Sequence, residues 1–273
     1  MFYPLSLNYL GRLVDEKELA RSKDFVQSLG RGLSIMKIFS AENPRLTLSE
    51  VAELTGYTRA TARRFLLTLE SLGYVGSTER HFFLKSQVLT LGYAYLSSFS
   101  LVSIAQMHLE ELSADLRESC SASVLEGENV IYVCRVTANR IMTINLAVGT
   151  QLPAYCTSMG RVLLASMKPA EIDSYFANAK LEKLTSKTVT DEAKLRTIVE
   201  EVRKNGYSIV SDELEEGLES VSVPIHGKDG KVLAAANISA HATRVSVDKL
   251  QNEFLPKLKK AVKEIEKALA MQS

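Results

Sequence analysis

The stretch from Thr47 to Val75 constrains the fold more than any other part of the sequence. It reads "TLSEVAELTGYTRATARRFLLTLESLGYV", in which two helical patterns are separated by one glycine. Thr47 and Glu50 have the spacing of a capping box, in which the two residues satisfy each other's free backbone amides at a helix start. Gly56 is suited to ending that helix, and Thr58 to capping the next one. The sequence therefore predicts two helices joined by a tight turn.

The second of these helices is expected to bury one face and expose three arginines. Its apolar residues follow helical spacing at Ala62, Phe65, Leu66, Leu69 and Leu72, and Gly73 suits the left-handed position that ends a helix. Arg59, Arg63 and Arg64 lie away from the core face in the first two turns. There the positive end of the helix dipole disfavours each cation by roughly 0.3–1 kcal/mol. This placement weakens the helix unless a polyanion lies at its N-terminal end.

The flanking residues complete a small domain. Leu29, Leu33, Met36 and Phe39 recur at helical spacing and predict an earlier, short helix. After Gly73, "YVGSTERHFFLK" predicts two strands joined by a polar tip at residues 77–80. Three helices followed by a hairpin indicate a winged helix-turn-helix domain at residues 25–86. Residues 1–24 show no sustained periodicity and are expected to form a flexible arm.

Such a domain binds DNA by inserting its second motif helix into the major groove. Residues 21–87 hold ten Lys and Arg against six Asp and Glu, although the net charge of the whole chain is only +1. The expected contacts to bases and nearby phosphates are Arg59, Thr61, Arg63 and Arg64, and the expected backbone and wing contacts are Arg45, Thr47, Arg80 and His81. The alternative is a solvated helix face with surplus arginine.

Residues 87–100 are apolar and predict a linker helix packed against a partner, and residues 101–273 predict a second domain. Its strand-like runs are "NVIYVCRV", "IMTINLAV", "YSIVSDE", "SVSVPIH" and "KVLAAANISA". They alternate with helical runs at about 104–117, 158–167, 169–178, 190–205 and 247–270. This alternation is typical of an α+β or α/β domain built on one sheet.

No group of residues in the sequence predicts catalysis, a cofactor or a metal site. The acidic run Asp212, Glu213, Glu215, Glu216 and Glu219 lacks histidine and is expected to be a solvated loop. Cys120, Cys134 and Cys156 are widely spaced and predict reduced, buried thiols in a cytoplasmic protein. Nothing resembles a secretion signal, and no apolar run is long enough to span a bilayer.

The second domain does contain a candidate site for a small anion. In "CTSMGRVLLA", Thr157, Ser158 and the amides of the following residues would present donors at the start of a helix. Asn237 and Ser239 share one face of a strand and interrupt an apolar run. A ligand could satisfy these two polar side chains, and exposure to solvent is the alternative. Arg135, at the end of a strand, is either a further partner for a carboxylate or an exposed strand end.

Four stretches resemble signatures of a known family. They are "SLGRGLSIMKIF", "LTLSEVAELTGYTRATARRFLLTLESLGYV", "VGTQLPAYCTSMGRVLLA" and "GYSIVSDELEEGLESVSVPIHGKDGKVLAAANIS". Together they resemble the IclR family of bacterial transcription factors over about residues 25–270. Within it, "RATARRFLLTLESLGY", "LTLGYAYLSS" and "LPAYCTSMGRVLLA" are most similar to regulators of aromatic-acid breakdown through the β-ketoadipate pathway. Those regulators respond to protocatechuate, β-ketoadipate or 4-hydroxybenzoate.

The resemblance implies an α+β chain with a winged helix-turn-helix, a linker helix and a GAF-like effector domain around a central antiparallel sheet. It also implies a homodimer or homotetramer on double-stranded promoter DNA. The family's effector position corresponds here to Ser158, Met159, Leu218, Ser220, Asn237 and Ser239. Val210 stands where members that bind small keto acids have an acidic residue, and Asn237 where they have serine. The site is thus less anionic, which suits a larger, partly apolar acid.

The resulting hypothesis is a ligand-responsive regulator of aromatic-acid catabolism genes that is not an enzyme. One alternative is a regulator of the same family that responds to a different small carboxylic acid. Two others are an enzyme that uses the helix-turn-helix only for interaction, and an architectural DNA-binding protein without an effector.

Overall fold

The computed structural model describes residues 25–98, 100–138 and 146–271. They form two compact units whose boundary follows Ser97. The predicted arm at residues 1–24, and most of the strand predicted at residues 141–148, lie outside the described residues. The α+β class and the order of a winged helix-turn-helix followed by a sheet domain are confirmed.

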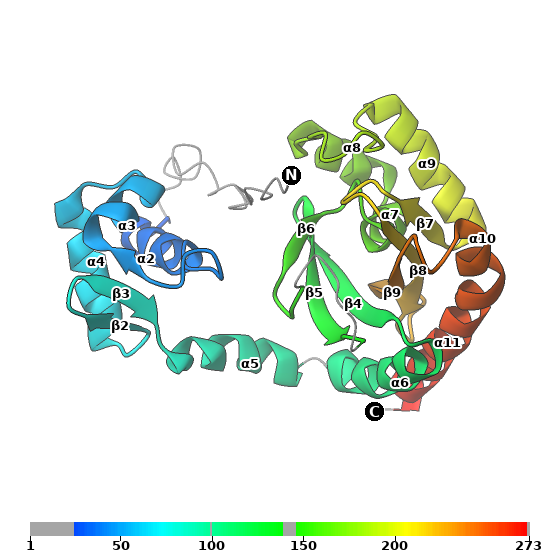
Figure 1. Cartoon of the computed structure of the whole chain (residues 1–273), viewed down its shortest axis with the longest axis horizontal. Coiled ribbons are helices and arrows are strands. Elements are labelled where there is room, and N and C mark those ends of the chain that lie inside the picture. Colours follow the sequence, from blue (N-terminus) through cyan, green and yellow to red (C-terminus); the bar gives the residue numbers. More distant parts are fainter. Residues whose placement is uncertain (1–24, 99, 139–145, 272–273) are drawn as a thin grey trace. The chain divides into compact units, whose positions relative to one another are not determined.

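The first unit is a winged helix-turn-helix (Figure 1). Its elements are α2 (Gln27–Lys37), β1 (Leu46–Thr47), α3 (Leu48–Thr55), α4 (Arg59–Ser71), β2 (Val75–Thr78), β3 (His81–Leu84), a 3-10 turn (Ser86–Val88) and α5 (Leu89–Ser98). The wing is an antiparallel sheet in the order β1-β3-β2, so the predicted hairpin gains a third, two-residue strand.

Local capping sets the helix boundaries in this unit. The amide of Thr47 donates to Glu50 Oε2 at 2.7 Å and the amide of Glu50 donates to Thr47 Oγ1 at 3.3 Å, which is the predicted capping box. Gly56 and Gly73 follow α3 and α4 with φ of +69° and +83°. The left-handed conformation costs a residue with a Cβ roughly 1–2 kcal/mol, so glycine fits both positions.

The core of this unit uses only part of the apolar residues around its first helix, of which Met36 and Phe39 are half-buried and pack against it. Leu29 and Leu33 are 63% and 46% exposed, whereas Ile35 and Ile38 are buried. The sequence of α2 offers two apolar stripes, and packing against α4 selects the one that contains the isoleucines. On α4 the predicted core residues Ala62, Leu66 and Leu69 are buried, but Leu72 is 61% exposed.

The second unit is built on one six-stranded antiparallel sheet in the order β6-β5-β4-β9-β8-β7. Its strands are β4 (Ser119–Glu126), β5 (Asn129–Val136), β6 (Gln151–Pro153), β7 (Ser208–Ser211), β8 (Leu218–His226) and β9 (Val232–His241). Its helices are α6 (Ser100–Leu116), α7 (Ser158–Ala165), α8 (Pro169–Asn178), α9 (Glu192–Asn205), α10 (Val247–Lys249), a π-helical stretch (Leu250–Phe254) and α11 (Leu255–Met271).

The two faces of this sheet differ in character. One face carries apolar side chains such as Ala122, Val223 and Ile238 and packs against α6 and α11 (Figure 1). The opposite face is covered by α7 and carries small polar side chains that pair in register across the strands. These are Ser119, Ser121, Ser123, Ser208, Ser220, Ser222, Asn237 and Ser239, all buried. We call this set the serine face.

Two features of the second unit depart from the sequence prediction. The central strand β4 was not predicted, and the acidic run is not a solvated loop, because Glu213 and Glu219 are only 8% and 4% exposed. The apolar linker segment forms α5, and the next helix, α6, begins at Ser100. In the described part of the chain no individual helix has the length and apolar character of a membrane span, although the bent pair Ser86–Ser97 and Ser100–Leu116 meets both criteria jointly.

Candidate DNA-binding helix and ligand pocket

The three arginines of α4 lie on its exposed face. Arg59, Arg63 and Arg64 are exposed, and within the described ranges none of them forms an ion pair with a carboxylate. Thr61 is half-buried, and its hydroxyl accepts a hydrogen bond from Thr58 Oγ1 at 2.9 Å. The first turn of α4 contains no acidic residue, so its positive end is not neutralised locally.

The predicted wing and backbone contacts belong to the three-stranded sheet and its approach. Thr47 and His81 are register partners, and Arg45 stacks over the ring of Phe83 with 5.4 Å between Cζ and the ring centroid. Arg80 is exposed at the tip of the hairpin, beside Glu79 at φ +56°. The hydroxyl of Thr47 already donates to Glu50 Oε2 at 2.8 Å. Thr47 therefore stabilises the start of α3 whether or not it also contacts DNA.

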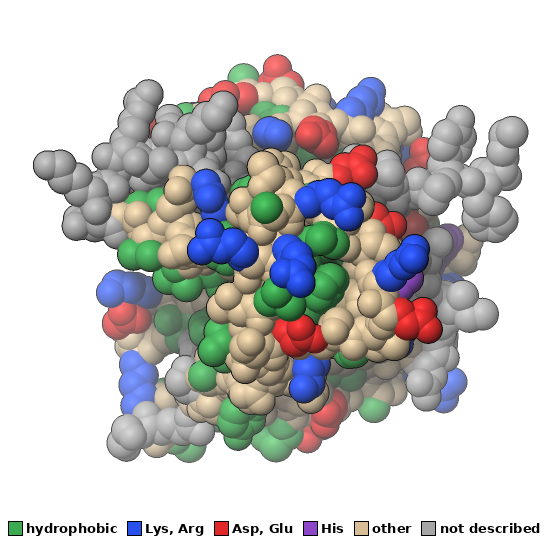
Figure 2. All heavy atoms as spheres, turned by 90° about the vertical axis from the view of Figure 1, so that its left-hand side faces the viewer, with side chains coloured by type: hydrophobic (Ala, Val, Ile, Leu, Met, Phe, Trp, Pro, Cys, Tyr) green, Lys and Arg blue, Asp and Glu red, His purple; other side chains and the backbone are tan. Residues whose placement is uncertain are grey.

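Basic side chains are spread over the face shown in Figure 2, with hydrophobic side chains between them. This view looks at the side that lies on the left in Figure 1, where the winged helix-turn-helix is drawn. Acidic side chains also appear on this face, so the arginines of α4, and not the charge of the whole face, support contact with DNA.

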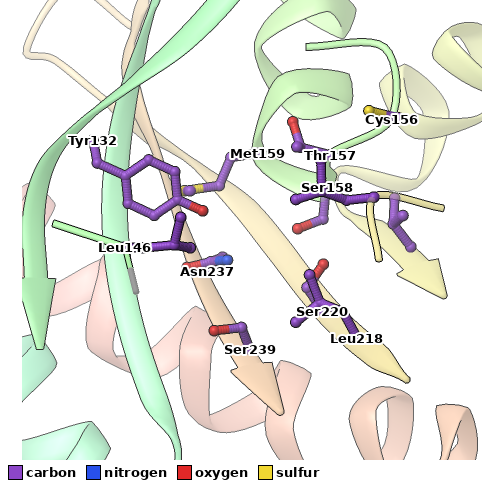
Figure 3. Close-up of a pocket in the computed structure, with 12 residues that line it drawn as sticks. Tyr132, Leu146, Cys156, Thr157, Ser158, Met159, Leu218, Ser220, Asn237 and Ser239 are labelled. Atoms are coloured by element: carbon purple, nitrogen blue, oxygen red, sulfur yellow. The ribbon is translucent and has the colours of Figure 1, made fainter. Parts of the chain in front are cut away.

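A pocket lies between the start of α7 and the serine face of the sheet (Figure 3). Its lining residues are Tyr132, Leu146, Cys156, Thr157, Ser158, Met159, Val210, Leu214, Leu218, Ser220, Asn237 and Ser239. The structure thus brings together six of the seven predicted effector residues, and Arg135 is not among the lining side chains. The cavity volume is about 20 Å³, which is room for about one water molecule.

The start of α7 is held in place by capping and by close packing. Thr157 Oγ1 accepts from the amide of Gly160 at 3.2 Å and donates to the carbonyl of Pro153 at 3.1 Å. A Cβ on Gly160 would lie 2.2 Å from the carbonyl oxygen of Ala154, so only glycine allows the helix to sit this close to the backbone. The amides of Ser158 and Met159 precede the first intrahelical hydrogen bond and point out of the helix end.

Three buried polar atoms in the pocket have no hydrogen-bond partner in the described chain. They are Ser158 Oγ, Asn237 Oδ1 and Ser239 Oγ, from residues that are at most 4% exposed. The alternative that Asn237 and Ser239 face solvent is therefore excluded. Figure 3 shows Asn237 and Tyr132 on one side of the pocket and Ser158 and Ser220 on the other. An unpaired buried donor or acceptor costs about 1–3 kcal/mol, so unpaired atoms around one cavity point to a ligand.

Titratable groups in the pocket are neutral near pH 7. Burial raises the pKa of the Tyr132 hydroxyl to about 12, so it remains protonated. Burial also raises the pKa of the Cys156 thiol to about 12, which leaves no thiolate for nucleophilic chemistry. The lining contains no Asp, Glu, Lys, Arg or His. The described residues also contain no group of three or more His, Cys, Asp or Glu placed to hold a metal ion.

A buried ion pair behind the pocket was not found from the sequence. Arg161 Nη1 lies 2.7 Å from Glu213 Oε1, and Arg161 Nη2 donates to Glu213 Oε2 at 2.7 Å. The amide of Val189 also donates to Glu213 Oε2, at 3.0 Å. The pair ties the β7–β8 loop, which supplies Leu214 and leads into β8 at Leu218, to the helix that supplies Ser158. Glu213 lies 52 positions after Arg161, so no local sequence pattern predicts that the two residues pair.

The serine face was also missed, although the sequence carries a signal for it. Serine alternates with apolar residues in "SCSAS" at positions 119–123 and in "SVS" at 220–222, which is the period of a strand. Ser123 donates to Met159 Sδ at 3.2 Å and so orients a lining side chain. Alternating serines therefore identify the strands that build the pocket.

A winged helix-turn-helix joined to a unit with an internal polar pocket defines a DNA-binding protein that responds to a small molecule. Two family models match the chain, the IclR helix-turn-helix domain at residues 28–79 and the bacterial transcriptional regulator IclR C-terminal domain at residues 93–267. The chain belongs to the IclR family of bacterial transcriptional regulators.

Similar proteins regulate transcription. The chain is 42% identical to the Pca regulon regulatory protein of Pseudomonas putida, over 89% of this chain and 84% of the relative. It is 32% identical to the p-hydroxybenzoate hydroxylase transcriptional activator of Acinetobacter baylyi, over 94% of this chain and 96% of the relative.

Solved structures share the fold. A crystal structure from Rhodococcus sp. RHA1, described as that of a transcriptional regulator, is 47% identical with a TM-score of 0.80, over 91% of this chain and all of that one. The inducer-binding domain of a PobR double mutant from Acinetobacter, in complex with 3-hydroxybenzoic acid, is 29% identical with a TM-score of 0.58. That match covers 60% of this chain and 97% of the domain.

Proposed function

We propose that this regulator controls genes of aromatic-acid catabolism, and that an aromatic acid in the pocket of the second unit sets its action on promoter DNA. The observation that carries the proposal is the set of unpaired buried atoms, Ser158 Oγ, Asn237 Oδ1 and Ser239 Oγ, around one cavity. The names of the relatives support the choice of pathway, since one concerns the pca regulon and another a p-hydroxybenzoate hydroxylase.

The residues that line the pocket favour particular chemical groups in a ligand. Leu146, Leu214 and Leu218 offer apolar surface to a ring, while Ser158 and Ser239 offer hydroxyls that can donate to ligand oxygens. Asn237 Oδ1 can only accept, so it favours a ligand that carries a hydroxyl group. A hydroxylated aromatic acid provides a ring, a donor and acceptors together.

Binding must enlarge the cavity, because about 20 Å³ does not hold a ring. Met159 is unbranched and flexible, and it can change rotamer at low cost. Its thioether accepts from Ser123, so its movement would exchange that hydrogen bond for contacts with the ligand. The pocket is therefore a closed form that the effector opens.

We further propose that the N-terminal half of α4 enters the major groove of promoter DNA. Arg59, Thr61, Arg63 and Arg64 would contact bases and adjacent phosphates, and Arg45, Thr47, Arg80 and His81 would contact the backbone from the wing and its approach. The exposed arginines at the positive end of α4 support this, because a polyanion removes the repulsion between them and the helix dipole.

Assembly into a homodimer or homotetramer is also part of the proposal. Leu89 and Tyr93 of α5 are 73% and 71% exposed within one chain, and Leu91 is 51% exposed. Contiguous apolar exposure of this kind marks an interaction surface, and a second copy of α5 would cover it. The effector would favour one arrangement of the dimer, and α5 would pass this preference to the DNA-binding units. Such a protein acts where the chromosome is, in the cytoplasm.

The experiment that tests the effector proposal is a thermal-shift screen with 4-hydroxybenzoate, protocatechuate, β-ketoadipate and aliphatic monocarboxylic acids. A ligand that binds only the folded state raises the melting temperature. We expect an aromatic acid to do so, and we expect Ser158→Ala and Asn237→Ala to reduce the shift. Ser174→Ala, an exposed change on α8, serves as the control. A shift with the aliphatic monocarboxylic acids alone would instead favour a different pathway, and no shift with any acid would contradict an acid effector.

A further inference from the structure

Arg135 is a half-buried cation without a counter-ion in the described part of the chain. Its Nη1 donates to Ser121 Oγ at 2.8 Å, and its Nε is buried without a hydrogen-bond partner. Desolvation lowers the pKa of the guanidinium, and the groups that oppose this effect among the described residues are Tyr132 and Cys120, neither of which is a carboxylate. A cation removed from water without a negative partner is costly, which makes it a candidate binding point for an anion.

Strand register brings Arg135 to the edge of the proposed effector site. Arg135 pairs with Ser121, and Ser121 pairs with Asn237, so the three lie in one row across β5, β4 and β9 on the serine face. The guanidinium lies beside Tyr132, with 6.0 Å between Cζ and the ring centroid, and Tyr132 lines the cavity. Arg135 therefore stands next to the cavity wall, on the side opposite Ser158.

Two groups around the pocket attract a carboxylate, and their strengths differ. The N-terminus of α7 is equivalent to about half a positive charge, and the Thr157 side chain already satisfies one of its amides. The guanidinium carries a full charge, and its Nε edge can hold both oxygens of a carboxylate. Within a lining that has no charged side chain, the full charge is the stronger attraction.

We propose that Arg135 holds the carboxylate of the effector, while Ser158 and the start of α7 hold its uncharged polar end. This rests on the proposed effector function and adds the orientation of the ligand. In this arrangement the acid enters with its charged end toward β5, and its ring lies against Met159 and the leucines. A ring hydroxyl then reaches Asn237 Oδ1 or Ser158 Oγ, both of which lack partners.

The experiment compares acids with analogues that lack one carboxyl group, by isothermal titration calorimetry. The pairs are 4-hydroxybenzoate with phenol and protocatechuate with catechol, in which the analogue carries no carboxylate. For Arg135→Gln we expect roughly a tenfold to hundredfold loss of affinity for the bound acid and little change for its analogue. Arg135→Lys should recover part of the loss because it keeps the charge. Ser158→Ala should weaken binding of acid and analogue by similar factors.

Arg196→Gln is the matched control, because it removes one positive charge from α9, where Arg196 pairs with Asp173 and Glu192. It should leave both affinities unchanged. If Arg135→Gln keeps the wild-type preference for the acid, or if Ser158→Ala abolishes that preference instead, the orientation proposed here is overturned and the effector function stands. If the wild-type protein binds none of the acids, the effector function fails, and this inference fails with it.

Discussion

The guanidinium of Arg161 and the carboxylate of Glu213 meet at two points, each 2.7 Å long, inside the second unit. Arg161 also donates through Nε to the carbonyl of Tyr155 at 2.9 Å. Removal of one partner leaves a buried charge without compensation, which costs about 3–5 kcal/mol. We expect Arg161→Met to lower the free energy of unfolding by an amount in this range in urea titrations. The double variant Arg161→Met/Glu213→Leu should lose less than the sum of the single losses. Additive losses would show that the two side chains do not interact.

Gly160 is expected to tolerate no side chain. A Cβ there would lie 2.2 Å from Ala154 O and 2.4 Å from Ala154 Cα, both backbone atoms that cannot move alone. Gly160→Ala should therefore destabilise the protein by about 2 kcal/mol or more and weaken effector binding, because α7 must shift. Gly32→Ala, where the nearest atom is Phe65 Cδ1 at 4.0 Å, is the control and should be neutral or stabilising by up to about 1 kcal/mol. Equal melting temperatures for both variants would rule out the close approach.

Arg63→Ala and Arg64→Ala should each weaken binding of DNA by roughly 1–3 kcal/mol, measured on a fragment that the wild-type protein selects from a random pool. If the lost contact is to a phosphate, the slope of log K against log salt should fall by about one. Lys37→Ala removes the same charge from the end of α2 and is the control. Unchanged affinity and unchanged slope in both arginine variants would mean that α4 does not read DNA.

The three cysteines should be unreactive in the folded protein. Burial raises the pKa of Cys120, Cys134 and Cys156 from 9.0 to about 12. A thiol reagent at pH 8 should modify none of them until urea unfolds the chain. Because these folded-state pKa values lie above the unfolded value, their contribution to stability is complete below pH 9 and is lost as the pH rises toward 12. Rapid modification of Cys156 at pH 8 without denaturant would contradict its burial.

Local signals in the sequence were sufficient to predict where helices α3 and α4 of the first unit begin and end. The capping box at Thr47 and Glu50 and the two left-handed glycines set the ends of α3 and α4, because caps involve residues only a few positions apart. Helical spacing could not show which side chains of α2 are buried, because two apolar stripes compete and only packing against α4 decides between them. Propensity and periodicity do not contain that information.

In the second unit, one central strand and a buried ion pair could not be predicted from local patterns in the sequence. Strand β4 was missed because it alternates serine with small apolar residues, and buried serines in strands look like exposed loop residues in a sequence. Ser158, Asn237 and Ser239 were predicted from local patterns, and Met159, Leu218 and Ser220 through resemblance to the family. Tyr132 and Leu146 come from segments that carry no motif. The Arg161–Glu213 pair joins distant parts of the chain, and contacts of this kind become visible only in the folded structure.

The two-faced sheet separates the positions that hold the fold together from those that recognise the ligand. Along β9, Ala236 and Ile238 pack against the helical layer, while the alternate residues Asn237 and Ser239 face the pocket. A substitution at an alternate position changes the shape and polarity offered to a ligand and leaves the core between the sheet and helices α6 and α11 unchanged. Single substitutions can therefore give new ligand preferences at little cost in stability. The same fold can then recognise another acid while its DNA-binding unit stays unchanged.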